Sequence, residues 1–318
     1  MRPKEKPISE LAPVIVFAYN RPKHLRKTLT ALKNNFLADQ SILYIYIDGP
    51  KHGASDDTLS NIEEVKKIAA SENWCSEVQI LYSEKNKGLA TSIIEGVSDV
   101  ISRHKKAIIL EDDMMTATGF LAYMNTALDL YQNNENVISI SGYVYPIKNL
   151  PETFFIRGAD CWGWATWERG WKLFEQNGEK LLEELSAKNL ENVFDYEDAY
   201  PFTSMLKNQI AGNNDSWAIR WYASAFLQNK LTLYPRKSLV QNIGFDGSGT
   251  HSGHEDYFHV HLSDKPIQIK RIACIQNQVC FIKFKKYLKA SQGIKAHPIK
   301  TFIKRGIGFL KKSFHYNG

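Results

Sequence analysis

Apolar runs and helical spacings alternate along the first 115 residues of the chain. Continuous apolar runs of this length are typical of strands buried on both faces, and they lie at 13–19, 42–47, 78–82 and 107–110. Between them, apolar residues recur three and four positions apart and predict helices over 23–33, 57–71 and 89–102. Because parallel strands are joined by helices, this alternation predicts a doubly wound α/β sheet.

The second half of the chain is less regular but keeps the same mixture of elements. Helices are expected over 120–131, 166–176, 179–188 and 216–228, and strands over 137–141 and 231–234. A loop rich in tryptophan is expected around 161–167. Internal repeats and low-complexity linkers are absent from the sequence, so residues 1–280 are predicted to form one domain with two lobes, 12–115 and 116–280.

The charge of the chain is concentrated at its C-terminal end. The net charge is +6, but residues 281–318 hold ten Lys or Arg and no Asp or Glu, which leaves 30 basic and 34 acidic residues elsewhere. This segment alternates lysines with Phe, Tyr, Leu and Ile. Such a basic amphipathic tail is expected at an anionic membrane surface, with its aromatic rings at the interface. A solvated tail and a docked helix are the alternatives.

Other classes of protein are disfavoured by what the sequence lacks. The four cysteines show no CxxC spacing, which argues against a zinc site or a disulfide scaffold and for reduced thiols. Apolar runs of about 18 residues, the length of a membrane span, are absent, and so is a signal peptide. We therefore expect a cytoplasmic protein. The acidic body and the lack of a recognised motif argue against nucleic-acid binding.

The fourth apolar run ends abruptly in three carboxylates, Glu111-Asp112-Asp113. Because burying an unpaired carboxylate is costly, three in a row at the end of a buried strand call for a compensating positive charge. Divalent cations such as Mg²⁺ or Mn²⁺ prefer oxygen ligands, and ligands lie at the carboxyl ends of strands in open sheets. We assign the metal to Asp113 and neighbouring hydrogen bonds to Glu111 and Asp112. A solvated acidic loop is the alternative.

Several motifs together resemble a known family. In chain order they are Asn20-Arg21, Asp48, Glu111-Asp112-Asp113, Gly163-Trp164, Asp215-Ser216-Trp217 and residues 235–251. Their order resembles the glycosyltransferases of GT-A fold, most closely the β-1,2-N-acetylglucosaminyltransferase I family, and also the bacterial family-2 glycosyltransferases of polysaccharide assembly. The resemblance covers roughly residues 12–255. It implies a Rossmann-like mixed sheet flanked by helices, with a nucleotide-sugar-binding lobe followed by an acceptor-binding lobe.

Position by position, the resemblance implies a donor site at the carboxyl ends of the strands. Residues near the nucleotide base and diphosphate would be Ala18, Tyr19, Asn20, Arg21 and Lys87. Asp48 would accept a hydrogen bond from uracil or ribose, and Asp112 would contact the ribose or the donor sugar. His251 would reach the metal or the diphosphate. Each position also has a structural reading, since Asn20-Arg21-Pro22 suits a strand exit, Asp48-Gly49-Pro50 suits a turn, and His251 suits a solvated loop.

An inverting transfer needs a carboxylate that takes the acceptor's proton. Asp215 is the first candidate because it precedes an apolar helix pattern in the region where the resembling family carries its base, although an Asp there also suits a helix N-cap. Asp160 is the second candidate. Trp162 and Trp164 are expected to line the acceptor pocket, since sugar rings stack on aromatic faces, and Trp167 and Trp171 are expected to pack. Residues 244–251 are expected to form a lid.

Together these features predict a Mn²⁺- or Mg²⁺-dependent glycosyltransferase that uses a nucleotide-diphospho sugar, preferably a UDP-sugar. The acceptor would be a glycan or a lipid-linked oligosaccharide in the synthesis of a bacterial surface polysaccharide. The enzyme would lie peripherally at the inner face of the cell membrane. Two alternatives stay open: a sugar nucleotidyltransferase, and a non-catalytic carbohydrate-binding protein on a degenerate transferase fold.

Overall fold

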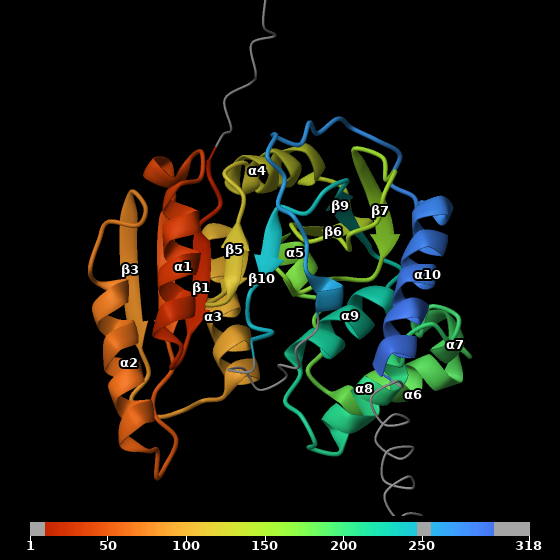
Figure 1. The fold of residues 1–318 in the computed structure, drawn as a ribbon. Coiled ribbons are helices and arrows are strands. Elements are labelled where there is room, and N and C mark those ends of the chain that lie inside the picture. The colour runs from red at the N-terminus through yellow and green to blue at the C-terminus, as the bar shows by residue number, and fades with distance from the viewer. Residues whose placement is uncertain (1–9, 247–255, 296–318) are drawn as a thin grey trace, which may run out of the picture.

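The computed structural model describes residues 10–246 and 256–295. Within them, eight strands form one sheet in the order β3-β2-β1-β4-β8-β6-β9-β7 (Figure 1). The first four strands of this order are mutually parallel. Their bounds are β1 (Val14–Ala18), β2 (Ile42–Ile47), β3 (Glu77–Tyr82) and β4 (Lys106–Glu111). The strands predicted from the apolar runs are therefore confirmed, and the first half of the fold is Rossmann-like.

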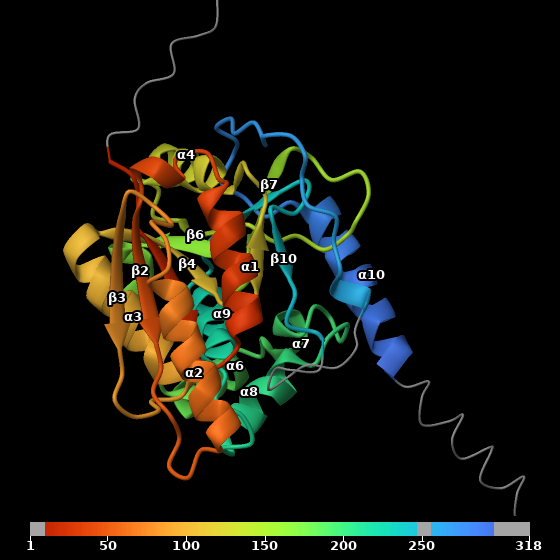
Figure 2. The same ribbon diagram turned by 60° about the vertical axis from the view of Figure 1, so that its left-hand side comes forward.

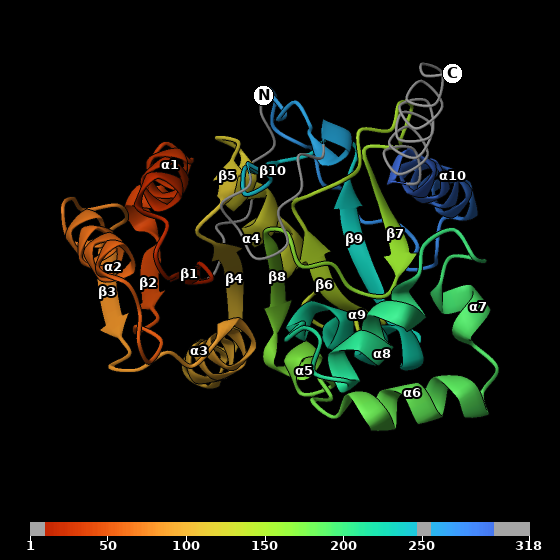
Figure 3. The same cartoon turned by 60° about the horizontal axis from the view of Figure 1, so that its bottom comes forward.

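The helices of this half cover both faces of the parallel strands. Helices α1 (Pro22–Lys33) and α2 (Asp56–Ala69) pack together on one face, and α3 (Leu89–His104) packs on the other (Figure 3). Helix α1 begins with Pro22, whose missing N–H costs nothing in the first helical turn. Helix α2 is capped by Ser55, whose hydroxyl accepts a hydrogen bond from the backbone N–H of Thr58. A short 3₁₀ helix, η1 (Ala38–Gln40), leads into β2.

The second half of the sheet is mixed. Its strands are β6 (Val137–Ser141), β7 (Thr153–Arg157), β8 (Trp164–Trp167) and β9 (Leu231–Pro235). Strand β8 runs antiparallel to both β4 and β6, and so it joins the two halves of the sheet. Strand β9 is parallel to β6 and antiparallel to β7. The expected mixed sheet flanked by helices is thereby confirmed.

The expected helix over 166–176 is wrong at its start. Strand β8 extends to Trp167, and only the four residues of α5 (Glu168–Trp171) are helical after it. The hydroxyl of Thr166 donates to the carbonyl oxygen of Ile138 (2.6 Å), while the backbone pairs with β4 and β6. Pairing with two strands far away in the sequence therefore overrides the local helical spacing.

The remaining helices complete two layers around the sheet (Figures 1 and 2). Their bounds are α4 (Phe120–Tyr131), α6 (Gly178–Ala187), α7 (Glu191–Phe194), α8 (Phe202–Ile210), α9 (Trp217–Leu227), η2 (Asp256–Phe258) and α10 (Gln278–Lys295). Helix α4 shares a core with α1 and α2, and α9 shares one with α3. A separate two-stranded ribbon pairs β5 (Met114–Thr116) with β10 (Val240–Asn242). In the described part of the chain, the helices fall short of what a membrane crossing requires.

Four tryptophans form the centre of the core between β8, α5 and α9. Trp164 is fully buried, and its ring stacks on that of Trp217 with 5.4 Å between the ring centroids. Trp171 and Trp221 complete the cluster. Because Trp217 is the first residue of α9, this cluster fixes the N-terminus of that helix against the sheet.

Candidate functional site

The carboxyl ends of β1, β2 and β4 border a cavity of about 380 Å³. The N-terminus of α9 and the residues just before β8 close its other side. Ten of the residues that the sequence singled out line it: Ala18, Tyr19, Asn20, Arg21, Asp48, Glu111, Asp112, Asp113, Trp162 and Asp215. The fold therefore brings together five segments that are far apart in the sequence, and their individual roles stay predictions.

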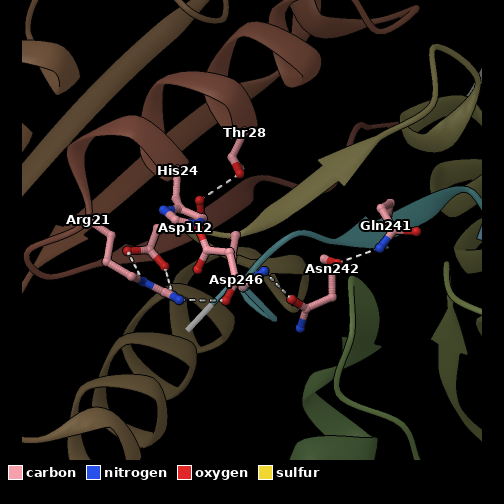
Figure 4. A network of polar contacts seen from close by, with 9 residues as sticks. Arg21, His24, Thr28, Asp112, Gln241, Asn242 and Asp246 are labelled. Atoms are coloured by element: carbon pink, nitrogen blue, oxygen red, sulfur yellow. Dashed lines mark hydrogen bonds and ion pairs between the residues drawn. The ribbon is translucent and has the colours of Figure 1, made fainter. Parts of the chain in front are cut away.

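Arg21 compensates two of the three carboxylates at the end of β4. Its guanidinium forms an ion pair with the carboxylate of Asp112, to which both Nε and Nη2 donate (Figure 4). The Nη1 atom lies 2.9 Å from Asp113 Oδ2. Arg21 stands immediately before α1, and Thr28 of that helix donates its hydroxyl to the carbonyl oxygen of Asp112 (2.7 Å). Helix α1 thus holds the acidic segment both by charge and by a hydrogen bond.

This arrangement shifts the pKa values of Glu111, Asp112 and Arg21. Burial, followed by the charges of Asp113 and Asp112, raises the pKa of Glu111 above the ordinary carboxyl value. Burial also raises the pKa of Asp112, and Arg21 opposes that rise. For Arg21, burial works against the charged form, but the two aspartates outweigh it and raise the pKa. Arg21 therefore stays a cation in the wall of the cavity.

Asp113 retains one oxygen that fits a divalent cation. Its Oδ1 atom is buried and has no hydrogen-bond partner in the described residues, whereas Oδ2 pairs with Arg21. Clusters of three or more His, Cys, Asp or Glu side chains suited to a metal are not found in residues 10–246 and 256–295. Mg²⁺ is commonly held by one or two carboxylates with substrate phosphates and water, so one free Asp113 oxygen is compatible with such a cation. His251, the second predicted ligand, lies outside the described residues.

The loop after β10 packs closely over the acidic segment. The backbone N–H of Ile243 donates to the carbonyl oxygen of Asp113 (2.9 Å), and His24 Nε2 lies 3.1 Å from Asp246 Oδ2 (Figure 4). A Cβ atom added at Gly244 would overlap Asp113 Oδ2. Only glycine therefore allows the backbone this approach. Of the lid expected over 244–251, residues 244–246 are described and lie against Asp113 and α1.

Asp48 organises the loops at the end of β2. Its Oδ1 accepts hydrogen bonds from the backbone N–H groups of Gly49 and Lys87, both at 2.9 Å. Its Oδ2 accepts from the Asn86 side chain (2.9 Å) and from the backbone N–H of Gly88 (3.1 Å). A carboxylate has about four acceptor positions, and these bonds use them all. The expected hydrogen bond from uracil or ribose to Asp48 therefore finds no free acceptor in this arrangement, and the turn interpretation fits better.

Asp215 faces the cavity from the second half of the chain. The N-cap of α9 is Ser216, whose hydroxyl accepts from the backbone N–H of Ile219 (3.3 Å), so Asp215 does not serve as the cap. Its side chain is 62% exposed, and its Oδ1 lies 3.6 Å from Arg220 Nη2. A Cβ added at Gly88, the N-cap of α3, would lie 3.4 Å from Asp215 Oδ2. The carboxylate therefore lies at the N-terminus of α3, where a negative charge is favoured.

Three of the predicted residues do not line the cavity. Trp164 is buried among tryptophans, so direct contact with an acceptor is excluded by its packing in this structure. Lys87 is exposed, and its Nζ pairs with Glu95 (2.7 Å). Asp160 accepts hydrogen bonds from the backbone of Cys161 (2.7 Å) and the hydroxyl of Tyr234 (3.4 Å), and burial raises the pKa of its carboxyl. Asp160 therefore supports the loop that carries Trp162.

Other cavity residues were not predicted from the sequence. They include Phe17, Tyr46, Asn86, Ser92, Cys161 and Asn242, whereas Phe245 belongs to the segment expected to form a lid. Tyr46 follows the alternation of β2, and its ring stacks on Phe17 with 5.4 Å between centroids, a pairing that the parallel order of β1 and β2 implies. Asn242 gives no such signal, because it reaches the cavity only through the pairing of β10 with β5.

Comparison with known proteins adds little to this geometry. The sequence matches no protein-family model and no curated protein. One solved structure of TarS from S. aureus is similar at a TM-score of 0.31 and 16% identity, covering 45% of this chain and 24% of that chain. A structure of residues 1–349 of TarS is similar at a TM-score of 0.32 and 13% identity, covering 52% of this chain and 48% of that chain. The similarity spans less than half of either TarS structure. At these TM-scores it assigns neither a family nor a function to this chain.

Gly244→Ala should destabilise the loop over Asp113. The added methyl group overlaps a buried carboxylate, and overpacking of this kind costs about 1–3 kcal/mol. Urea denaturation followed by circular dichroism measures the loss. Gly119→Ala is the matched control, because its methyl group would meet Pro266 Cα at an ordinary 3.6 Å. Equal stability of the two variants would contradict the close approach of Gly244 to Asp113.

Trp164→Ala and Trp162→Ala should differ strongly in stability. Removing the fully buried Trp164 leaves a cavity among three other tryptophans, which should cost about 3–5 kcal/mol in the free energy of unfolding. Trp162 is only partly buried at the cavity wall, so its truncation should cost much less. The same urea titration compares them, and equal losses would refute the assignment of Trp164 to the core.

Proposed function

We propose that this protein is a glycosyltransferase that moves a sugar from a nucleotide-diphospho sugar, with UDP as the preferred nucleotide, to a glycan or lipid-linked acceptor. One observation carries the proposal: a buried Asp112–Asp113 pair bound to Arg21 shares a cavity with the exposed carboxylate of Asp215. Arg21 and a cation held by Asp113 suit a diphosphate leaving group, and the carboxylate of Asp215 suits a general base. The resemblance of the motifs to GT-A enzymes supports the same reading.

The donor would lie along the ends of β1, β2 and β4. Arg21 keeps a fixed positive charge in the cavity wall, and a fixed charge of this kind stabilises a leaving diphosphate. Tyr46 lines the same wall with its ring stacked on that of the buried Phe17, and an aromatic ring there suits the flat face of a nucleotide base. When bound, Mn²⁺ or Mg²⁺ held by Asp113 would supply further positive charge against the developing diphosphate.

The acceptor would enter from the side of α9. Asp215 takes the proton of the acceptor hydroxyl, and the oxygen forms a bond to the anomeric carbon. The bond between that carbon and the diphosphate oxygen breaks, and the diphosphate leaves with the electron pair. Attack from the face opposite the leaving group inverts the configuration. Trp162 lines the same cavity and offers a surface on which a sugar ring can stack.

A sugar nucleotidyltransferase fits these residues less well. Such enzymes typically carry a glycine-rich basic loop after the first strand, whereas this chain continues from Ala18 through Tyr19-Asn20-Arg21 directly into α1. A non-catalytic carbohydrate-binding protein has no need for a charged pair at the end of β4. A bacterial surface polysaccharide is the proposed context for the transfer.

Nucleotide binding tests the donor site directly. A thermal-shift panel of UDP, GDP, dTDP and CMP, each with Mn²⁺ and with EDTA, should show a Mn²⁺-dependent rise in Tm for UDP, since a ligand that binds only the folded state stabilises it. Asp113→Asn should abolish the metal-dependent part of the shift. Asp264→Asn, at an exposed position far away in the sequence, is the control. The absence of any shift with all four nucleotides would refute the transferase proposal.

Asp215→Asn tests the base. Nucleotide binding should stay intact, while turnover of the nucleotide sugar should fall by about 10²–10⁴-fold, the usual contribution of a general base. Release of the nucleoside diphosphate in the presence of acceptor measures the turnover, and the thermal shift measures the binding. Asp264→Asn again serves as the control. Full turnover of the Asp215 variant would assign the base to another residue.

A further inference from the structure

Helix α10 uses its aromatic residues to pack against the body of the protein. Phe281, Phe284 and Leu288 are buried in a core shared with β7, β9 and α9. The ring of Phe281 stacks on Tyr196 with 5.1 Å between centroids, and Phe284 contacts Tyr145 edge to face at 5.0 Å. The expectation that the aromatic residues of 281–318 lie at a membrane interface is therefore wrong for Phe281 and Phe284.

The opposite side of this segment exposes aliphatic side chains instead. Ile275 is 70% exposed, Val279 64% and Ile282 49%, and the first two are the most exposed large hydrophobic residues in the described part of the chain. On α10, Val279 and Ile282 are followed at helical spacing by Lys286 and Lys289, which are also exposed. Positions 279, 282, 286 and 289 therefore form one stripe along the helix, and Ile275 lies just before the helix begins at Gln278. These five residues are here called the α10 stripe.

The charged residues of α10 itself are all lysines. Two other lysines of the helix are engaged with the body: Lys283 Nζ donates to the carbonyl oxygen of Asn149 (2.6 Å), and Lys285 pairs with Glu197. Lys286 and Lys289 are instead exposed. The sequence from 281 to 318 contains no Asp or Glu. It adds six Lys or Arg after Lys289. A partner of the opposite charge is therefore favoured.

We propose that the α10 stripe docks on an anionic membrane surface, with Ile275, Val279 and Ile282 inserted among the headgroups and Lys286 and Lys289 on lipid phosphates. Exposed aliphatic side chains beside lysines have this chemistry in helices that lie in the plane of the interface. A stable protein partner would need about 800 Å² on each side, which three aliphatic side chains do not provide. A single-stranded nucleic acid would need aromatic faces for its bases, and α10 has turned Phe281 and Phe284 inward. A duplex would engage the lysines through its phosphates but would leave the aliphatic side chains in water.

Docking of this kind would fix the orientation of the protein. Helix α10 lies at the end of the molecule opposite β3 and α2, and it packs against β7 (Figure 1). The cavity at the ends of β1 and β4 would therefore take a defined position relative to the membrane. This property does not depend on the transfer reaction, so it can hold or fail separately from the proposed function.

Vesicle co-sedimentation tests the α10 stripe in the full chain. The wild type should bind vesicles of equimolar phosphatidylcholine and phosphatidylglycerol, and bind phosphatidylcholine vesicles much less. The double variants Val279→Asp/Ile282→Asp and Lys286→Glu/Lys289→Glu should each lower the partition coefficient at least about tenfold. Binding by the wild type should also weaken as salt is raised, because the lysine contribution is screened.

Matched controls lie on α2, at the far end of the sheet. Leu59→Asp and Lys67→Glu make the same chemical changes at exposed positions and should leave vesicle binding unchanged. The Tm and the nucleotide-induced shift of all variants should equal those of the wild type, which separates loss of docking from loss of folding or of the donor site. Equal vesicle binding by the stripe variants and the wild type would overturn the proposal. So would a wild-type dimer in solution that Val279→Asp/Ile282→Asp dissociates.

Discussion

The charge of Arg21 makes the rest of this site possible. Two adjacent aspartates lie almost fully buried at the end of a strand, and without a nearby cation their mutual repulsion and desolvation would favour the protonated or unfolded chain. Arg21 reaches them because β1 and β4 are neighbours in the sheet and because the chain turns into α1 directly after Arg21. Three features of the architecture thus meet in one ion-pair network: strand order, strand exit and helix start. The loop at Gly244 then closes over that network.

The two halves of the molecule meet in the cavity through contacts of different kinds. On one side, Asp48 ties the end of β2 to the N-terminus of α3 by three hydrogen bonds from residues 86–88, so that wall is held by polar contacts. On the other side, the tryptophan cluster fixes the start of α9 by packing. Asp215 lies just before that helix, and its side chain belongs to neither set. Its exposed side chain therefore stands on a backbone that the packing of Trp217 holds in place.

What the sequence predicted, and what it did not, follows from the range of the interactions. Strands 42–47 and 137–141 and helix 120–131 agree residue for residue, because continuous apolar runs and helical spacings are local signals. Short strands such as β5, β8 and β10 were not predicted, since only pairing with distant partners makes them strands. Ten of the residues singled out from the sequence line the cavity, because strand ends of a parallel sheet converge on one edge. Their partners were not: Arg21 and Asp112 are 91 positions apart, and the bonds that fill Asp48 come from a turn some 40 residues later.

Helix α10 shows what helical periodicity leaves undecided. Its sequence is amphipathic in two senses, with aromatic residues on one side and aliphatic residues on another, and periodicity alone does not say which side faces the core. Phenylalanine rings bury more apolar area than isoleucine or valine, so packing them against Tyr145 and Tyr196 is the more stabilising choice. The aliphatic side is then left in water beside lysines. These three exposed aliphatic side chains bring no stability to the isolated molecule, and for that reason the proposed docking surface is placed on this side of α10.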